Sequence, residues 1–141
     1  RRLFNGFYLV RRNEAWRKVY YDLFESKKNQ SPSFKEIITT LHSKTGYVEA
    51  SFSSKMVATL NPEFPIWDQF VLRNLGLKLV GNKEERLHSA IALYDEIRNW
   101  YADYLGTDDA RECLAEFDRI LPNYSWLTDV KKIDCFLWSM R

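Results

Sequence analysis

The chain has 141 residues, of which 45% are hydrophobic, 16% aromatic and 28% charged, with only five glycines and four prolines. This composition excludes collagen-like, low-complexity and disordered proteins and predicts one core, so that residues 1–141 form a single helical domain. No apolar run approaches the roughly 20 residues of a membrane-spanning helix, and no signal-peptide pattern is present. We therefore expect a cytoplasmic protein that does not enter a membrane.

The net charge of +2 conceals an uneven distribution of charge. Residues 1–30 carry eight basic and three acidic side chains, whereas residues 91–120 carry three basic and eight acidic ones. Because screening lets only nearby charges act together, we expect one basic and one acidic face. The basic segment suits a phosphate backbone, and it equally suits a solvated face that keeps the protein soluble.

Capping residues and apolar periodicity predict an all-α fold, a compact bundle of about seven helices. Asn13 is expected to be the N-cap of the first helix, and Gly46 is expected to end the second one. Asn82 and Glu85 together predict a capping box. Asn61 precedes a proline and so ends a helix. In chain order, the expected helical ranges with their caps are 13–28, 31–46, 53–60, 68–76, 82–106, 107–121 and 128–140.

The longest predicted helix carries apolar side chains at intervals of three and four residues, which indicates a face turned to the core or to a partner. These residues are Leu87, Ile91, Tyr94, Ile97, Tyr101 and Tyr104. The two cysteines, Cys113 and Cys135, also fall in apolar helical patterns, and we interpret them as core thiols.

Several kinds of chemistry lack their usual motifs. No Walker loop, dinucleotide-binding GxGxxG, zinc-protease HExxH or hydrolase GxSxG occurs. His42 and His88 are far apart and are interpreted as ordinary helix residues, and the acidic residues between 95 and 118 lack the fixed spacing of a cation site. We expect neither a metal nor a cofactor.

One segment differs from plain scaffold. In Ser51-Phe52-Ser53-Ser54-Lys55, a polar turn leading into a helix at Ser53 or Ser54 would present free backbone N–H groups to a phosphate, next to the charge of Lys55. Asp68 follows Trp67 at the start of the next predicted helix, where the helix dipole favours an ionised carboxylate.

This arrangement resembles the helix-hairpin-helix DNA glycosylase superfamily, the endonuclease III and 8-oxoguanine glycosylase group. Residues 51–55 can be laid over its hairpin pattern Gly-Val-Gly-x-Lys, and residues 68–73 over Asp-x-x-Val-x-Arg. The resemblance implies that Asp68 is the catalytic carboxylate and that Lys55 is the nucleophile of members that also cleave the backbone. It implies double-stranded DNA as the partner, contacted by Ser51, Ser53, Ser54, Arg73 and Lys44. Residues 128–134 look like the last helix of compact bacterial members.

In such an enzyme the target nucleotide rotates out of the duplex and its base stacks between apolar or aromatic side chains. Trp67 and Phe64 are the stacking candidates, and Trp126 and Trp138 flank the last helix. Asp68 would stabilise positive charge on the sugar or orient a water molecule, and a neutral Lys55 would form a Schiff base.

Other interpretations stay open. Lys55 as a surface lysine and Asp68 as a plain N-cap account for the same residues. The chain is then a noncatalytic helical module that holds DNA, or a protein partner through the helix of residues 87–105. A subunit whose basic and acidic faces pair head to tail is a third possibility, although we expect a monomer or weak dimer.

Overall fold

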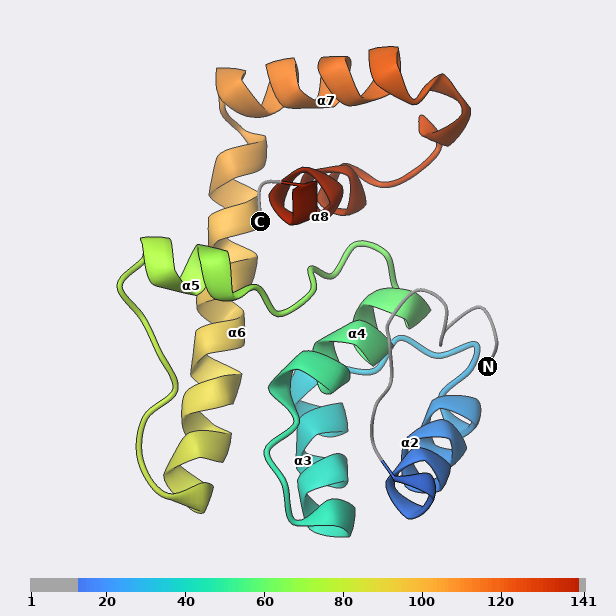
Figure 1. The fold of residues 1–141 in the computed structure, drawn as a ribbon, viewed down its shortest axis with the longest axis vertical. Coiled ribbons are helices and arrows are strands. Elements are labelled where there is room, and N and C mark those ends of the chain that lie inside the picture. The colour runs from blue at the N-terminus through green and yellow to red at the C-terminus, as the bar shows by residue number, and fades with distance from the viewer. Residues whose placement is uncertain (1–12, 140–141) are drawn as a thin grey trace.

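The computed structural model describes residues 13–139, and within this range the chain forms seven α-helices and one 3-10 helix, with no strand (Figure 1). The all-α prediction is thereby confirmed. The elements are α2 (Glu14–Ser26), α3 (Phe34–Thr45), α4 (Ala50–Leu60), α5 (Gln69–Asn74), α6 (Lys83–Leu105), α7 (Asp108–Ile120), η1 (Pro122–Tyr124) and α8 (Asp129–Ser139). None of the described helices has the length and apolar character needed to cross a membrane.

Side-chain caps account for most of the helix starts. Asn13 accepts a hydrogen bond from the Trp16 N–H at 2.8 Å, and Asn82 and Glu85 form the predicted capping box. Helix α3 begins later than expected, because the hydroxyl of Ser33 accepts from the Glu36 N–H and so makes Ser33 the cap. Gly46 ends α3 at φ +79°, a left-handed conformation that glycine adopts without a Cβ clash.

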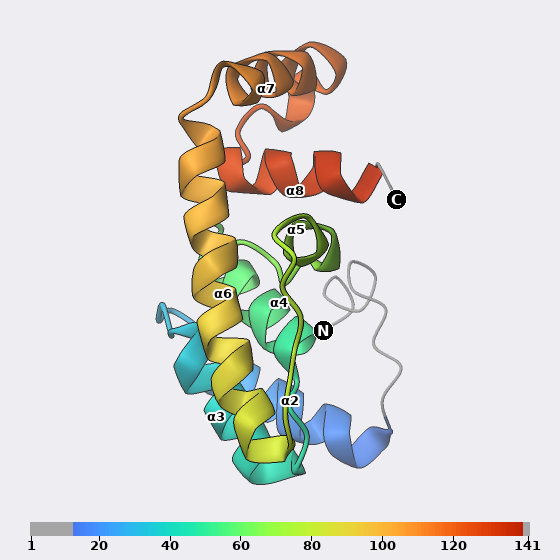
Figure 2. The ribbon, with the colours of Figure 1, turned by 90° about the vertical axis from the view of Figure 1, so that its left-hand side faces the viewer.

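Helix α6 is the axis of the molecule. Two views at right angles show α3 beside its N-terminal half and α7 and α8 beside its C-terminal end (Figures 1 and 2). Helices α2 and α4 pack on α3. Helix α5 lies across the middle, between these two groups. The segments before and after α5 therefore lie close enough to contact both the helices α2 to α4 and the helices α7 and α8.

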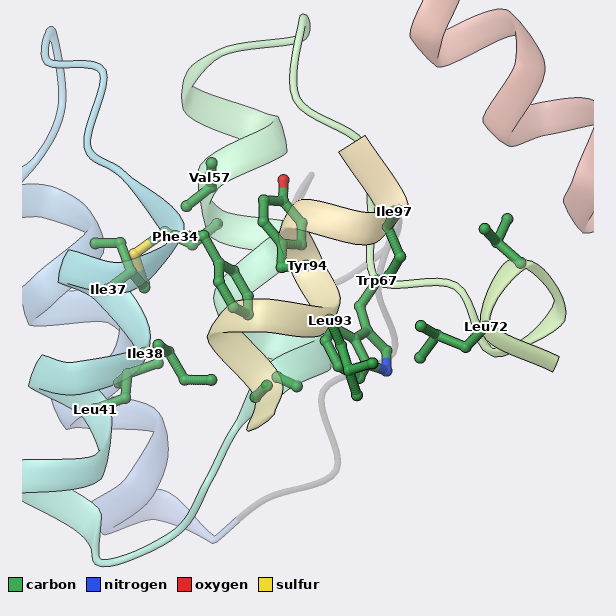
Figure 3. Packing of buried hydrophobic residues seen from close by; sticks show 14 of the residues in the cluster. Phe34, Ile37, Ile38, Leu41, Val57, Trp67, Leu72, Leu93, Tyr94 and Ile97 are labelled. Atoms are coloured by element: carbon green, nitrogen blue, oxygen red, sulfur yellow. The ribbon is translucent and has the colours of Figure 1, made fainter. Parts of the chain in front are cut away.

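The core is formed by apolar side chains from α2, α3, α4, α5, α6 and α8 and from the segment before α5. Figure 3 shows the part where side chains of α3, α4, α5 and α6 meet around Trp67. Phe34 stacks on Tyr94 with ring centroids 4.0 Å apart and on Trp67 at 6.3 Å. Large rings bury about 150–250 Å² each, so this stack contributes much of the burial that joins α3 to α6.

One core prediction is wrong. Cys113 is half-buried, but Cys135 is exposed. Helix α8 buries Val130, Ile133 and Leu137, which recur at intervals of three and four residues, and Cys135 falls on the other side of the helix.

Candidate functional site

The predicted polar turn before Ser53 is a helix. Helix α4 begins at Ala50, and the Ser53 N–H donates to the carbonyl of Glu49 at 2.9 Å, so it is not free to bind a phosphate. Ser53 and Ser54 are fully buried. The expectation that residues 51–55 form a phosphate-binding hairpin turn is wrong, because neither glycine nor proline interrupts this stretch and tertiary packing overrides the weak turn preference of serine.

The buried Ser54 instead connects α4 to the segment that precedes α5. Its Oγ accepts from the Trp67 N–H at 2.7 Å and donates to the Ser51 carbonyl at 2.8 Å. The buried Ser54 therefore positions the backbone of Trp67.

A pocket of about 290 Å³ lies between the first turns of α4, the start of α5 and the loop that follows α5. It brings together three of the predicted residues, Ser51, Lys55 and Trp67. Val48, Ala50, Ile66, Gln69 and Leu79 complete its lining. The lining thus combines apolar side chains with an amine, a hydroxyl and an amide for polar contacts.

Lys55 is the titratable group of this pocket. Burial lowers the pKa of its amine below the usual value of 10.5, since desolvation disfavours the charged form. The Nζ atom lies 5.0 Å from the centre of the Phe52 ring. Lys55 as a whole is half-buried, and it belongs to the pocket lining.

Asp68 is the N-cap of α5, as its position in the sequence predicted. Its Oδ1 atom accepts from the N–H groups of Phe70 at 2.8 Å and of Val71 at 3.2 Å. The residue is only 2% exposed and does not line the pocket, although its neighbour Trp67 does. The structure therefore brings Lys55 and Trp67 together and directs Asp68 toward α5.

The remaining predicted residues lie apart from the pocket lining. Phe64 is half-buried beneath the guanidinium of Arg98, which lies 4.6 Å from its ring centre. Arg73 is exposed on α5, and Lys44 is exposed at the end of α3, beside a different hollow that Tyr47 also lines.

The remaining sequence features are the tryptophans that flank the last helix and the basic N-terminal segment. Trp126 is 75% exposed in the loop after η1. Half of the basic residues of the N-terminal segment (Arg1, Arg2, Arg11 and Arg12) lie outside the described residues, as does the side chain of Trp138.

Sequence reasoning missed the side chains that hold the segment before α5. The Tyr94 hydroxyl donates to the Pro65 carbonyl at 2.8 Å, and Asp134 accepts from the Ile66 N–H at 3.4 Å and from the Tyr101 hydroxyl. A carboxylate between Ile133 and Cys135 in an apolar stretch was the available signal, because such a residue is often buried with a partner.

Within residues 13–139, His, Cys, Asp and Glu side chains form no group of three that could hold a metal ion. Comparison of the chain with protein-family models, with curated proteins and with solved structures finds no match.

Proposed function

We propose that this chain binds double-stranded DNA and excises a damaged or modified base by cleaving its N-glycosidic bond. The observation that supports the proposal is the Lys55 amine, whose pKa burial lowers, at the edge of a pocket walled by Trp67. Partial desolvation increases the neutral fraction of an amine, and the neutral amine is the nucleophile.

The pocket suits a flat ring better than a large ligand. Its volume of about 290 Å³ lies near the lower end of the range of about 300–1,000 Å³ for ligand pockets. An extruded base would stack on an apolar or aromatic wall, which Trp67 and Ile66 supply, while Ser51 and Gln69 offer hydrogen bonds to its edge.

In the proposed reaction the neutral Nζ of Lys55 attacks C1′ of the sugar. The bond between C1′ and the base breaks, and the base leaves with the bonding electron pair and takes one proton of the amine. Opening of the sugar ring then transfers the second amine proton to O4′ and gives a Schiff base between Lys55 and C1′. No external oxidant or reductant is needed.

Asp68 acts in this proposal through its charge. Positive charge develops on the sugar as the base departs, and a carboxylate in a water-poor surrounding stabilises such charge more strongly than one in solvent. Asp68 is buried next to Trp67 along the chain, and its cap bonds to α5 hold it in place.

The test is incubation of the protein with a panel of duplexes carrying modified or mismatched bases, followed by alkali to cleave abasic sites. Borohydride added during turnover should trap a covalent protein–DNA adduct, and Lys55→Gln should abolish it. Lys35→Gln, which changes an exposed lysine of α3 in the same way, should leave trapping unchanged. Absence of excision on every duplex would contradict the enzymatic proposal, and trapping by Lys55→Gln would contradict the role of Lys55.

A second candidate function is a noncatalytic interaction module. It is favoured by four large apolar side chains exposed within seven residues, from the end of α7 to the loop after η1, namely Ile120, Leu121, Tyr124 and Trp126. Exposed apolar patches commonly mark contact surfaces. Salt-sensitive DNA binding without excision would favour a DNA-binding module, and absence of both would favour a protein-binding one.

A further inference from the structure

The segment from Pro65 to Trp67 is held by side chains from three helices. Tyr94 of α6 binds the Pro65 carbonyl, Asp134 of α8 binds the Ile66 N–H, and Ser54 of α4 binds the Trp67 N–H. Two of these three residues, Ile66 and Trp67, line the Lys55 pocket. The position of this wall of the pocket thus depends on α4, α6 and α8 together.

Asp134 differs from the other two partners because its charge can change. It is 3% exposed, its Oδ1 accepts from the Tyr101 hydroxyl and its Oδ2 accepts from the Ile66 N–H. The bond to Ile66 is 3.4 Å, against 2.7 Å for the bond from Trp67 to Ser54. A hydrogen bond this long is weak, and a charged acceptor strengthens it.

We propose that Asp134 is a positioning residue of the Lys55 pocket, whose ionised carboxylate holds the Ile66 N–H and thereby the wall formed by Ile66 and Trp67. The inference concerns the same pocket as the proposed function. It does not require excision, since it predicts a property of the protein without DNA.

The groups that face Asp134 determine the pH at which its carboxyl loses or gains a proton. Burial raises the pKa of the Asp134 carboxyl from 3.8 to about 6, and the negative charge of Asp68 also raises it. The hydrogen bond from Tyr101, the charge of Lys131 and the Ile66 N–H lower it. Tyr94, the second α6 side chain close enough to interact with the Asp134 charge, remains a neutral phenol over this range. Acidification through about pH 6 therefore neutralises Asp134 and weakens its bond to Ile66.

The experiment records the Ile66 amide and the Trp67 indole signals of the full chain by ¹H–¹⁵N NMR from pH 4.5 to 8, with Trp67→Phe identifying the indole. Both signals should shift with one midpoint near 6. In Asp134→Asn this shift should vanish, whereas Asp129→Asn, the same change at an exposed site of α8, should retain it. Persistence of the shift in Asp134→Asn, or its absence from the unmodified protein, would overturn the proposal.

Tyr101→Phe provides a test that does not depend on the folding of Asp134→Asn. It keeps the ring and removes one donor, and because that donor lowers the pKa of Asp134, the midpoint should move upward. An unmoved midpoint would contradict the proposal. The readout also separates this inference from the proposed function, since a protein without excision activity that shows the Asp134-dependent shift keeps the inference and loses only the enzyme.

Discussion

The backbone N–H of Trp67 donates to the hydroxyl of Ser54 at 2.7 Å, and the same hydroxyl donates to the Ser51 carbonyl at 2.8 Å. One buried oxygen therefore satisfies a donor in the wall of the pocket and an acceptor in its own helix. Through this pair of bonds, α4 determines where the Trp67 backbone lies relative to Lys55, which is one residue after Ser54.

Replacing Ser54 with Ala should destabilise the protein by about 1–3 kcal/mol, because the buried Trp67 N–H loses its acceptor and gains no water. Urea unfolding followed by circular dichroism measures this loss. Ser43→Ala, at an exposed position of α3, is the matched control and should change the free energy of unfolding by less than about 0.5 kcal/mol. Equal midpoints for the two variants would contradict the structural role of Ser54.

Asp134 should make the protein more stable on mild acidification. Its pKa is about 6 in the folded protein and 3.8 in the unfolded chain, so the folded state binds the proton more tightly between these values. This contribution is fully present below about pH 4 and is lost as the pH rises through about 6, and at about 1.4 kcal/mol per pKa unit it amounts to about 3 kcal/mol.

The measurement is the free energy of urea unfolding at several pH values from 4.5 to 7.5 for the unmodified protein and for Asp134→Asn. Carboxylates that do not interact with Asp134 contribute equally to both proteins, so the difference between the two proteins reports Asp134 together with its interaction with Asp68. The unmodified protein should lose stability relative to the variant as the pH rises. A difference that is constant with pH would show that the carboxyl has no raised pKa.

Substitutions of Asp68 should affect the stability of the protein and its excision activity to different extents. Asp68→Asn retains an oxygen that accepts from the N–H groups of Phe70 and Val71, so the free energy of unfolding should fall by only about 0.3 kcal/mol. Asp68→Ala removes this acceptor and should lower the free energy of unfolding by about 0.5–2 kcal/mol. If Asp68 stabilises the transition state, Asp68→Asn should lower single-turnover excision by orders of magnitude. A folded Asp68→Asn protein with full excision would remove the catalytic role.

Two glycines in the left-handed region should respond differently to the same substitution. At Gly46, with φ +79°, an added Cβ meets no atom within 4 Å, and Gly46→Ala should cost only the backbone strain of about 1 kcal/mol. At Gly81, with φ +93°, the added Cβ would collide with the Glu85 side chain that closes the capping box of α6. Gly81→Ala should therefore lower the melting temperature more than Gly46→Ala does.

The sequence predicted most helix boundaries because their determinants are local. Asn13, Asn82 with Glu85, and Asp68 each cap a helix through residues two or three positions away, and such patterns can be read from the chain. The start of α4 was placed wrongly because serines are common in turns. Ser53 and Ser54 are helical here because they are buried against other elements, and that packing is not visible in local sequence.

The candidate site was predictable only in part, because many of its contacts join residues that are far apart in the sequence. Lys55 and Trp67 are twelve residues apart, and both belong to the stretch that the sequence analysis singled out. The contacts that hold the pocket wall join Pro65 to Tyr94, 29 residues away, and Ile66 to Asp134, 68 residues away. Helix periodicity predicts that Tyr94 and Tyr101 are buried, but it carries no information about which distant carbonyl or carboxylate their hydroxyls will meet.

Two hydrogen bonds join the segment before α5 to residues much later in the chain. Ile66 is 68 residues from Asp134, and Pro62, whose carbonyl accepts from the Thr128 hydroxyl at 2.8 Å, is 66 residues from Thr128. These separations have a consequence for biosynthesis. At translation rates of about 5–20 residues per second, the segment before α5 leaves the ribosome several seconds before Thr128 and the last helix. Ser54 is already present during that interval, and Tyr94 follows, but α8 is still missing. Ile66 and Trp67 therefore reach their final arrangement late, and a nascent chain should expose this apolar segment to chaperones and proteases until α8 has emerged.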